Sequence, residues 1–154
     1  MIRSQDHVFK HQPPPIFFGM KISKLFSWEM GHRLMFHKGK CFNIHGHSYR
    51  ACVEVEGPVG VEGMVMDFSN LKQKVSPLID RMDHSFMLFS KDDLMSVFLS
   101  KSPFKVMRVD FETTAENIAG WMFAELKCSG LPVSKVTVWE TETSSAECCG
   151  SSGE

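Results

Sequence analysis

Three histidines in the first third of the chain have the residue type and spacing of a metal site. His45 and His47 flank Gly46 at the start of a strand-like run, so in an extended chain their side chains share one face. His32 ends the preceding strand-like run and can reach the same ion from a neighbouring strand. Three neutral imidazoles form the kind of zinc site that leaves a fourth position open for water or substrate. The pattern therefore predicts a catalytic metal centre.

A chance origin has to be weighed against this interpretation. The chain contains seven histidines, and a lone His-x-His pair occurs often without binding a metal. The proximity of Cys41 and His32 strengthens the metal interpretation. In contrast, His7, His11 and His37 have no such partners and are expected to be solvated surface residues.

Cys41 lies four residues before the first histidine of the pair, in a basic setting. His37, Lys38 and Lys40 come just before it. Nearby positive charge favours the thiolate form of a cysteine, so Cys41 is a candidate base or nucleophile. The alternatives are a fourth zinc ligand and an inert buried thiol.

Two further candidates lie later in the chain. Asp83 and His84 close a predicted helix, where His84 can carry a proton whose charged form Asp83 stabilises; such pairs also occur on ordinary surfaces at helix ends. Glu140 shares a predicted strand face with Val136 and Val138, where an unpaired carboxylate is costly. It can bind a flat, donor-rich ligand through both oxygens, or simply end the strand in solvent.

Composition limits the classes of protein to consider. The 154 residues fit one domain, and 43% hydrophobic with 23% charged residues is ordinary for a globular protein. A formal net charge of -1 gives no overall attraction to nucleic acid or an anionic membrane. Five cysteines without regular spacing favour a reducing compartment, and no apolar run resembles a signal peptide or a membrane span. We expect a cytoplasmic protein with no nucleic-acid or membrane partner.

Hydrophobic periodicity predicts an α+β domain. Strands are expected over 22–30, 48–56 and 133–141, and a helix over about 67–82 that contains Pro77. A second helix follows the capping-box match Thr113-Thr114-Ala115-Glu116 and ends at Gly130. Residues 85–111 are ambiguous between a short helix, an apolar loop and a short strand over 106–111. The helices are expected to cover one face of an antiparallel sheet.

Three segments are predicted. Residues 1–20 form an N-terminal extension that contains Pro13-Pro14-Pro15, residues 21–147 form the domain, and residues 148–154 form a flexible tail in which Cys148 and Cys149 are expected to carry no chemistry.

These segments closely resemble the 6-pyruvoyl-tetrahydropterin synthase family, which includes the bacterial 6-carboxy-tetrahydropterin synthases of queuosine biosynthesis. The resemblance runs from about residue 22 to 146 and rests on Gly31-His32-Arg33-Leu34, Cys41, His45-Gly46-His47-Ser48-Tyr49, Gly63-Met64-Val65-Met66-Asp67-Phe68, Leu71-Lys72, Asp83-His84, Thr114-Ala115-Glu116-Asn117-Ile118-Ala119 and Glu140-Thr141. The extension has no obvious family role, and residues 90–105 are longer and more apolar than the family pattern.

The resemblance implies a tunnelling fold, in which a four-stranded antiparallel sheet carries two helices on one face. It implies trimers that close the sheets into a barrel, a homohexamer of two stacked trimers, and active sites between subunits. It also implies zinc on His32, His45 and His47, proton acceptance by Cys41 and help with proton transfer from Asp83 and His84. Glu140 would anchor the pterin ring, helped by Thr113 and Thr114.

The implied substrate is 7,8-dihydroneopterin triphosphate, whose side-chain hydroxyls zinc would polarise as a Lewis acid. Two products compete, 6-carboxy-tetrahydropterin with acetaldehyde and 6-pyruvoyl-tetrahydropterin. The three residues between Cys41 and His45 resemble the carboxy-forming enzymes, so this product is predicted. A non-catalytic, zinc-stabilised pterin-binding module is the alternative outside enzymology. Arg33, Lys38 and Lys40 are candidates for meeting the triphosphate charge.

Overall fold

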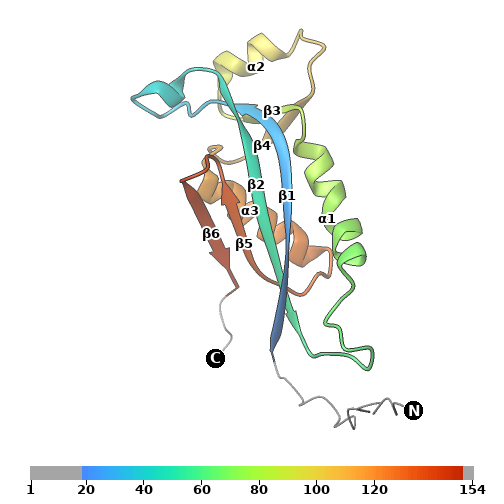
Figure 1. The fold of residues 1–154 in the computed structure, drawn as a ribbon. Helices are drawn as coiled ribbons and strands as arrows, with labels where there is room; N and C mark the ends of the chain where they lie inside the picture. The colour runs from blue at the N-terminus through green and yellow to red at the C-terminus, as the bar shows by residue number, and fades with distance from the viewer. Residues whose placement is uncertain (1–18, 151–154) are drawn as a thin grey trace, which may run out of the picture.

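The computed structural model describes residues 19–150 as a mixed sheet with helices packed against it (Figure 1). In spatial order the six strands are β4-β3-β1-β2-β5-β6. Along the chain the elements are β1 Met20–His32, the 3-10 turn η1 Lys40–Phe42, β2 His45–Gly57, α1 Phe68–Met82, β3 Ser85–Phe89, α2 Asp93–Leu99, β4 Val106–Val109, α3 Ala115–Cys128, β5 Val133–Trp139 and β6 Ser145–Cys149.

The long antiparallel pair β1–β2 carries the predicted metal ligands. Its register runs from Met20 opposite Gly57 to His32 opposite His45. Alternate side chains of β2, from Tyr49 to Val55, are fully buried, as the apolar alternation of this segment predicts. The histidines therefore lie at the end of the pair that continues into the turn η1.

Helices α1 and α3 cover one face of the sheet. The α1 stripe of Leu71, Val75, Leu78, Ile79 and Met82 is buried, and α1 packs on β1 while α3 packs on β5 and β6. The main core lies between this face and the two helices. The predicted α+β architecture is confirmed. Its antiparallel part consists of β1, β2, β5 and β6, and two helices pack against it.

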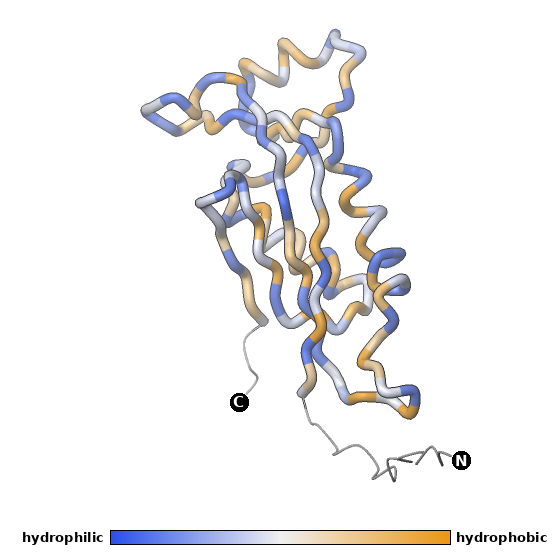
Figure 2. Tube along the Cα trace, viewed as in Figure 1, coloured by the Kyte–Doolittle hydropathy of each residue, from blue (hydrophilic) through white to orange (hydrophobic). Residues whose placement is uncertain are grey.

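The predicted four-stranded, wholly antiparallel sheet is incomplete, because residues 85–109 add two strands and a helix. Strand β3 pairs in parallel with β1, and β4 in parallel with β3. This region builds its own small apolar cluster from Leu88, Met95 and Leu99. The short apolar runs could not be assigned from periodicity alone, since strands and short helices look alike at this length. Figure 2 shows hydrophobic positions along α2.

The cap of α3 differs by one residue from the predicted capping box. Thr114, not Thr113, is the N-cap, and its hydroxyl accepts a hydrogen bond from the Asn117 amide at 3.4 Å. Thr113 is fully buried instead. This shift frees Thr113 to contact His32.

The segment boundaries can be compared only in part. Residues 1–18 of the predicted extension and residues 151–154 of the predicted tail lie outside the described residues. Strand β6 continues to Cys149, two residues past the predicted end of the domain at 147. Among residues 19–150, no helix is long and apolar enough to cross a membrane.

Candidate metal centre and active site

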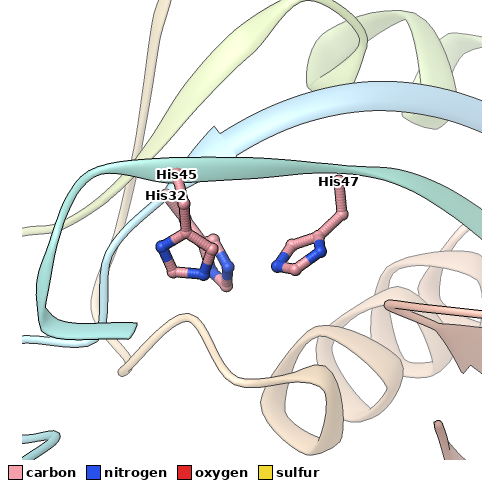
Figure 3. A group of neighbouring side chains, drawn as sticks. All are labelled: His32, His45 and His47. Carbon is pink, nitrogen blue, oxygen red and sulfur yellow. The ribbon is translucent and has the colours of Figure 1, made fainter. Parts of the chain in front are cut away.

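The structure brings the three predicted metal ligands together. One ring nitrogen from each of His32, His45 and His47 lies within 4.8 Å of the other two (Figure 3). The strand register explains this geometry, because His32 lies directly opposite His45 and His47 is two residues further along the same face of β2. The ring centroids of His32 and His45 are 4.5 Å apart, and those of His45 and His47 are 5.0 Å apart. The cluster is complete within one chain.

Backbone carbonyls orient two of the rings for metal binding. The Nδ1 of His32 lies 2.8 Å from the Thr113 carbonyl oxygen, and the Nδ1 of His45 lies 2.8 Å from the Asn43 carbonyl oxygen. A carbonyl only accepts, so each Nδ1 must donate, which leaves the lone pair on Nε2. This arrangement is the usual support of a metal-ligating imidazole.

The donor set fits a divalent metal such as zinc. The Nε2 atoms of His45 and His47 are shielded from solvent and have no hydrogen-bond partner among the described residues. Burial lowers the pKa of His32 to about 4 and also lowers that of His47, so both rings are neutral at physiological pH. Buried polar nitrogens without partners are costly unless a ligand satisfies them, and a zinc ion does so with three imidazoles.

Glu140 lies beside this cluster, just past the end of β5. Its Oε1 is 3.3 Å from the Nε2 of His32 and 3.7 Å from the Nε2 of His47. The hydroxyl of the fully buried Tyr49 donates to the same oxygen at 3.1 Å. Burial, with the negative charge of Glu140, raises the pKa of Tyr49, so the hydroxyl stays protonated as a donor. The Tyr49 hydroxyl thus holds the carboxylate beside the imidazole cluster, so Glu140 is not a free strand end.

Cys41 and Glu140 line one pocket of about 330 Å³. Cys41 lies in η1, whose turn is closed by a 2.8 Å hydrogen bond from the Leu34 amide to the Cys41 carbonyl. Thr114 and Glu116 also line this pocket. Glu116 was not among the predicted site residues. The signal available in the sequence was its place in the family motif that follows Thr114.

The two predicted threonines have different positions. Thr114 lines the pocket, whereas Thr113 supports His32 through its carbonyl and through a 3.2 Å contact of its hydroxyl with the Nδ1 of that ring. Thr113 therefore supports a histidine of the candidate metal site and does not line the pocket.

Asp83 and His84 lie away from the pocket of Cys41. The His84 side chain is 77% exposed and lines a separate, mainly apolar pocket of about 360 Å³ together with Ile44 and Phe86. The His84 Nδ1 is 2.9 Å from Asp83 Oδ1, which also accepts from the Glu29 amide at 3.0 Å. A single chain thus forms the Asp-His pair but does not place it beside Cys41.

Arg33 makes a structural contact. The sequence had suggested instead a free cation that could meet the triphosphate charge. Its guanidinium makes two hydrogen bonds to buried Asp92, at 2.6 and 2.8 Å, and stacks over the Phe42 ring with 4.7 Å from Cζ to the centroid. Asp92 also caps α2 by accepting from the Met95 amide at 3.1 Å. Arg33 therefore ties the Cys41 turn to α2, and its charge is already matched.

Known proteins resemble the chain in sequence along most of its length. The model of the family described as 6-pyruvoyl tetrahydropterin synthase matches residues 21–151. The 6-carboxy-5,6,7,8-tetrahydropterin synthase of Haemophilus influenzae is 43% identical over 136 residues, covering 82% of this chain and 96% of the relative. The enzyme of the same name from Synechocystis is 40% identical and covers 81% of this chain and 89% of the relative.

Solved structures agree with this relationship. The 6-pyruvoyl tetrahydropterin synthase of Caenorhabditis elegans superimposes with a TM-score of 0.65 at 29% identity, covering 86% of this chain and 96% of that one. An uncharacterised protein from Wolinella succinogenes has the same fold, with a TM-score of 0.76 at 24% identity over 87% of this chain and 99% of that one. The family resemblance seen in the sequence motifs is confirmed: the chain belongs to the 6-pyruvoyl tetrahydropterin synthase family, a family of enzymes.

Proposed function

We propose that this protein converts 7,8-dihydroneopterin triphosphate and water to 6-carboxy-5,6,7,8-tetrahydropterin, acetaldehyde and triphosphate. The observation that carries the proposal is a cluster of three imidazoles next to a pocket that contains Cys41 and Glu140. The relatives at 43% and 40% identity carry the name of the carboxy-forming synthase. The short spacing from Cys41 to His45 supports the same product.

The metal in this proposal is zinc. His32, His45 and His47 would hold it, each through Nε2. The Nδ1 atoms of His32 and His45 donate to backbone carbonyls, and the Nε2 atoms of His45 and His47 have no hydrogen-bond partner among the described residues. A bound zinc ion with an open position supplies Lewis-acid polarisation of the substrate's side-chain oxygens.

Cys41 and Glu140 have different roles in the proposal. Cys41 lines the pocket next to the metal cluster and serves as the base that removes a proton from the substrate side chain. Glu140 accepts hydrogen bonds from the amino and ring N-H groups of the pterin, and Tyr49 helps to fix the carboxylate. Thr114 and Glu116 offer further polar contacts in the same pocket, while Thr113 keeps His32 in place.

The Asp83–His84 pair is proposed to return or relay the second proton. Because His84 and Cys41 line different pockets of one chain, this role fits an assembly in which a neighbouring subunit supplies the pair. We propose the homohexamer of two stacked trimers implied by the family. A cytoplasmic location remains the prediction made from the sequence.

Product analysis tests the proposed reaction. The zinc-loaded protein is incubated with 7,8-dihydroneopterin triphosphate, acetaldehyde is trapped as a hydrazone, and the pterin is identified by mass spectrometry. We expect 6-carboxy-tetrahydropterin and acetaldehyde in equal amounts. Dominant 6-pyruvoyl-tetrahydropterin without acetaldehyde would reject the proposed product, and binding of the pterin without any product would favour the non-catalytic module.

A further inference from the structure

Lys105 forms a contact between the added β3–α2–β4 region and the end of α1. It immediately precedes β4, and its ammonium group donates to the carbonyl oxygens of Asp80 at 2.6 Å and Asp83 at 2.7 Å. Figure 1 shows the end of α1 beside the strands β3 and β4. Both carbonyls belong to the last turn of the helix or its cap, where the backbone has no further helical donors and carries partial negative charge. A lysine ammonium is a favourable partner there.

The turn that follows this contact has an unusual backbone. His84 has a φ of +54°, and it is the one residue other than glycine with positive φ among residues 19–150. This left-handed conformation is unfavourable for a non-glycine residue, so it persists where surrounding contacts determine it. Such strain is found at functional sites more often than elsewhere.

Contacts from both sides of the turn determine this conformation. On the side of β1, the Glu29 carbonyl accepts from the His84 amide at 2.7 Å, and the Glu29 amide donates to Asp83 at 3.0 Å. On the side of β4, Lys105 binds the Asp83 carbonyl. Hydrogen bonds from the Glu29 amide and from His84, with a smaller effect of the Lys105 charge, lower the pKa of Asp83. Asp83 is therefore ionised when it faces His84.

We propose that Lys105 is a positioning residue that holds the Asp83–His84 turn in the orientation needed for proton transfer. The inference rests on the proposed function for its catalytic consequence, but the contact itself involves only this chain. Lys105 and His84 also line the same pocket, so the added region contributes to the surroundings of the histidine. The β3–α2–β4 region thereby acts on the reaction through the backbone of the turn.

The substitution Lys105→Met tests this role because it keeps the length of the side chain and removes its donors. The backbone pairing between Phe86 and Lys105, a 2.9 Å hydrogen bond to the Lys105 carbonyl, does not need the ammonium group. Lys105→Arg restores a cationic donor, and Lys101→Met removes an exposed lysine for which no contact of this kind is present among the described residues. Comparing these variants separates the effect of the Lys105 contact from the effect of removing any positive charge.

We expect Lys105→Met to lower kcat about tenfold or more with KM and zinc content nearly unchanged, since misplacing a reacting group by about 1 Å can cost roughly 100-fold. Lys105→Arg should recover most of kcat, and Lys101→Met should resemble the wild type. An unchanged kcat in Lys105→Met would overturn the proposal. The proposal would also be overturned if Lys105→Met lowered the melting temperature and kcat and changed KM together, and if Lys105→Arg failed to restore them.

Hydrogen exchange gives a readout that needs no turnover. In Lys105→Met the His84 amide should exchange about fivefold faster, the scale expected from losing a cation at a helix end, while amides of β2 keep their protection. If the wild type has no synthase activity, the proposed function fails, whereas faster exchange at His84 still supports the positioning contact. Unchanged exchange at His84 would reject the contact even in an active enzyme.

Discussion

The imidazole cluster and the Asp83–His84 turn differ in how the chain prepares them. The cluster lies on two adjacent strands and is complete in one chain, with His45 and His47 half-buried and His32 fully shielded and oriented by Thr113. The Asp83–His84 turn displays a 77% exposed imidazole, and contacts from β1 and from Lys105 fix its backbone. In the proposed function the cluster binds a metal, which needs preformed ligands, and the Asp83–His84 pair carries a proton, which needs access to the substrate. The difference therefore indicates that metal binding should survive changes that abolish proton transfer.

The substitution His45→Ala should have the largest effect, because it removes one of the three proposed zinc ligands. We expect zinc content to fall well below one per chain and turnover to fall by about three orders of magnitude, since a Lewis acid contributes several kcal/mol. Elemental analysis and steady-state kinetics measure both effects. His37→Ala, which alters a histidine outside the cluster, should keep its zinc. Full zinc occupancy in His45→Ala would contradict the assigned ligand set.

Cys41→Ala should separate chemistry from metal binding. Zinc should stay near one per chain, while kcat falls by about 100-fold or more, the usual scale for a lost general base. The matched control is Cys128→Ala, which changes an exposed thiol on α3 and should keep wild-type activity. Loss of zinc in parallel with activity would mean that Cys41 serves the metal.

Glu140→Gln should mainly affect binding of the pterin. The amide keeps the shape of the side chain but turns one acceptor into a donor, leaving a mismatched contact that costs about 1–3 kcal/mol. Calorimetric titration with 7,8-dihydroneopterin, which lacks the triphosphate, measures the loss. Glu142→Gln alters an exposed carboxylate two residues away and serves as control. Equal affinity in wild type and Glu140→Gln would exclude Glu140 as the ring anchor.

The Arg33–Asp92 pair should affect stability more than chemistry. Burial raises the pKa of Asp92, but hydrogen bonds from Arg33 and the Met95 amide outweigh this effect, so the net pKa is lowered. A lowered pKa means that the pair's stabilisation is present above the unfolded value of about 4 and is lost as the pH falls through the folded value. Asp92→Asn should thus cost about 3–5 kcal/mol at pH 7, as for a broken buried pair.

Urea unfolding at pH 7 and at about pH 3 checks this expectation. The difference between wild type and Asp92→Asn should shrink at the lower pH, because about pH 3 lies below the unfolded pKa of about 4, where the stabilisation from the lowered pKa of Asp92 begins to be lost. Asp93→Asn, at the neighbouring position in the first turn of α2, should show little difference at either pH. A gap that stays constant with pH would show that the Asp92 charge is not the stabilising feature.

Local sequence patterns predicted the imidazole cluster and the main sheet better than the contacts between residues that are distant in the sequence. The alternation of β2 determines that His45 and His47 share a face, and antiparallel pairing with the preceding strand then brings in His32. The Arg33–Asp92 pair could not be predicted, because its partners are 59 residues apart. The sequence alone does not distinguish a buried, paired arginine from an exposed one. The one-residue shift from Thr113 to Thr114 likewise depends on a distant contact, that of Thr113 with His32.

X-ray absorption at the zinc edge, recorded on the zinc-loaded wild type, tests the central claim most directly. The account predicts three nitrogen ligands at about 2.0–2.1 Å and one light, exchangeable oxygen ligand, with no sulfur in the first coordination sphere. The same spectrum is expected from Cys41→Ala. A sulfur ligand at about 2.3 Å in the wild type, lost in Cys41→Ala, would contradict a catalytic centre with an open position and a free thiol base.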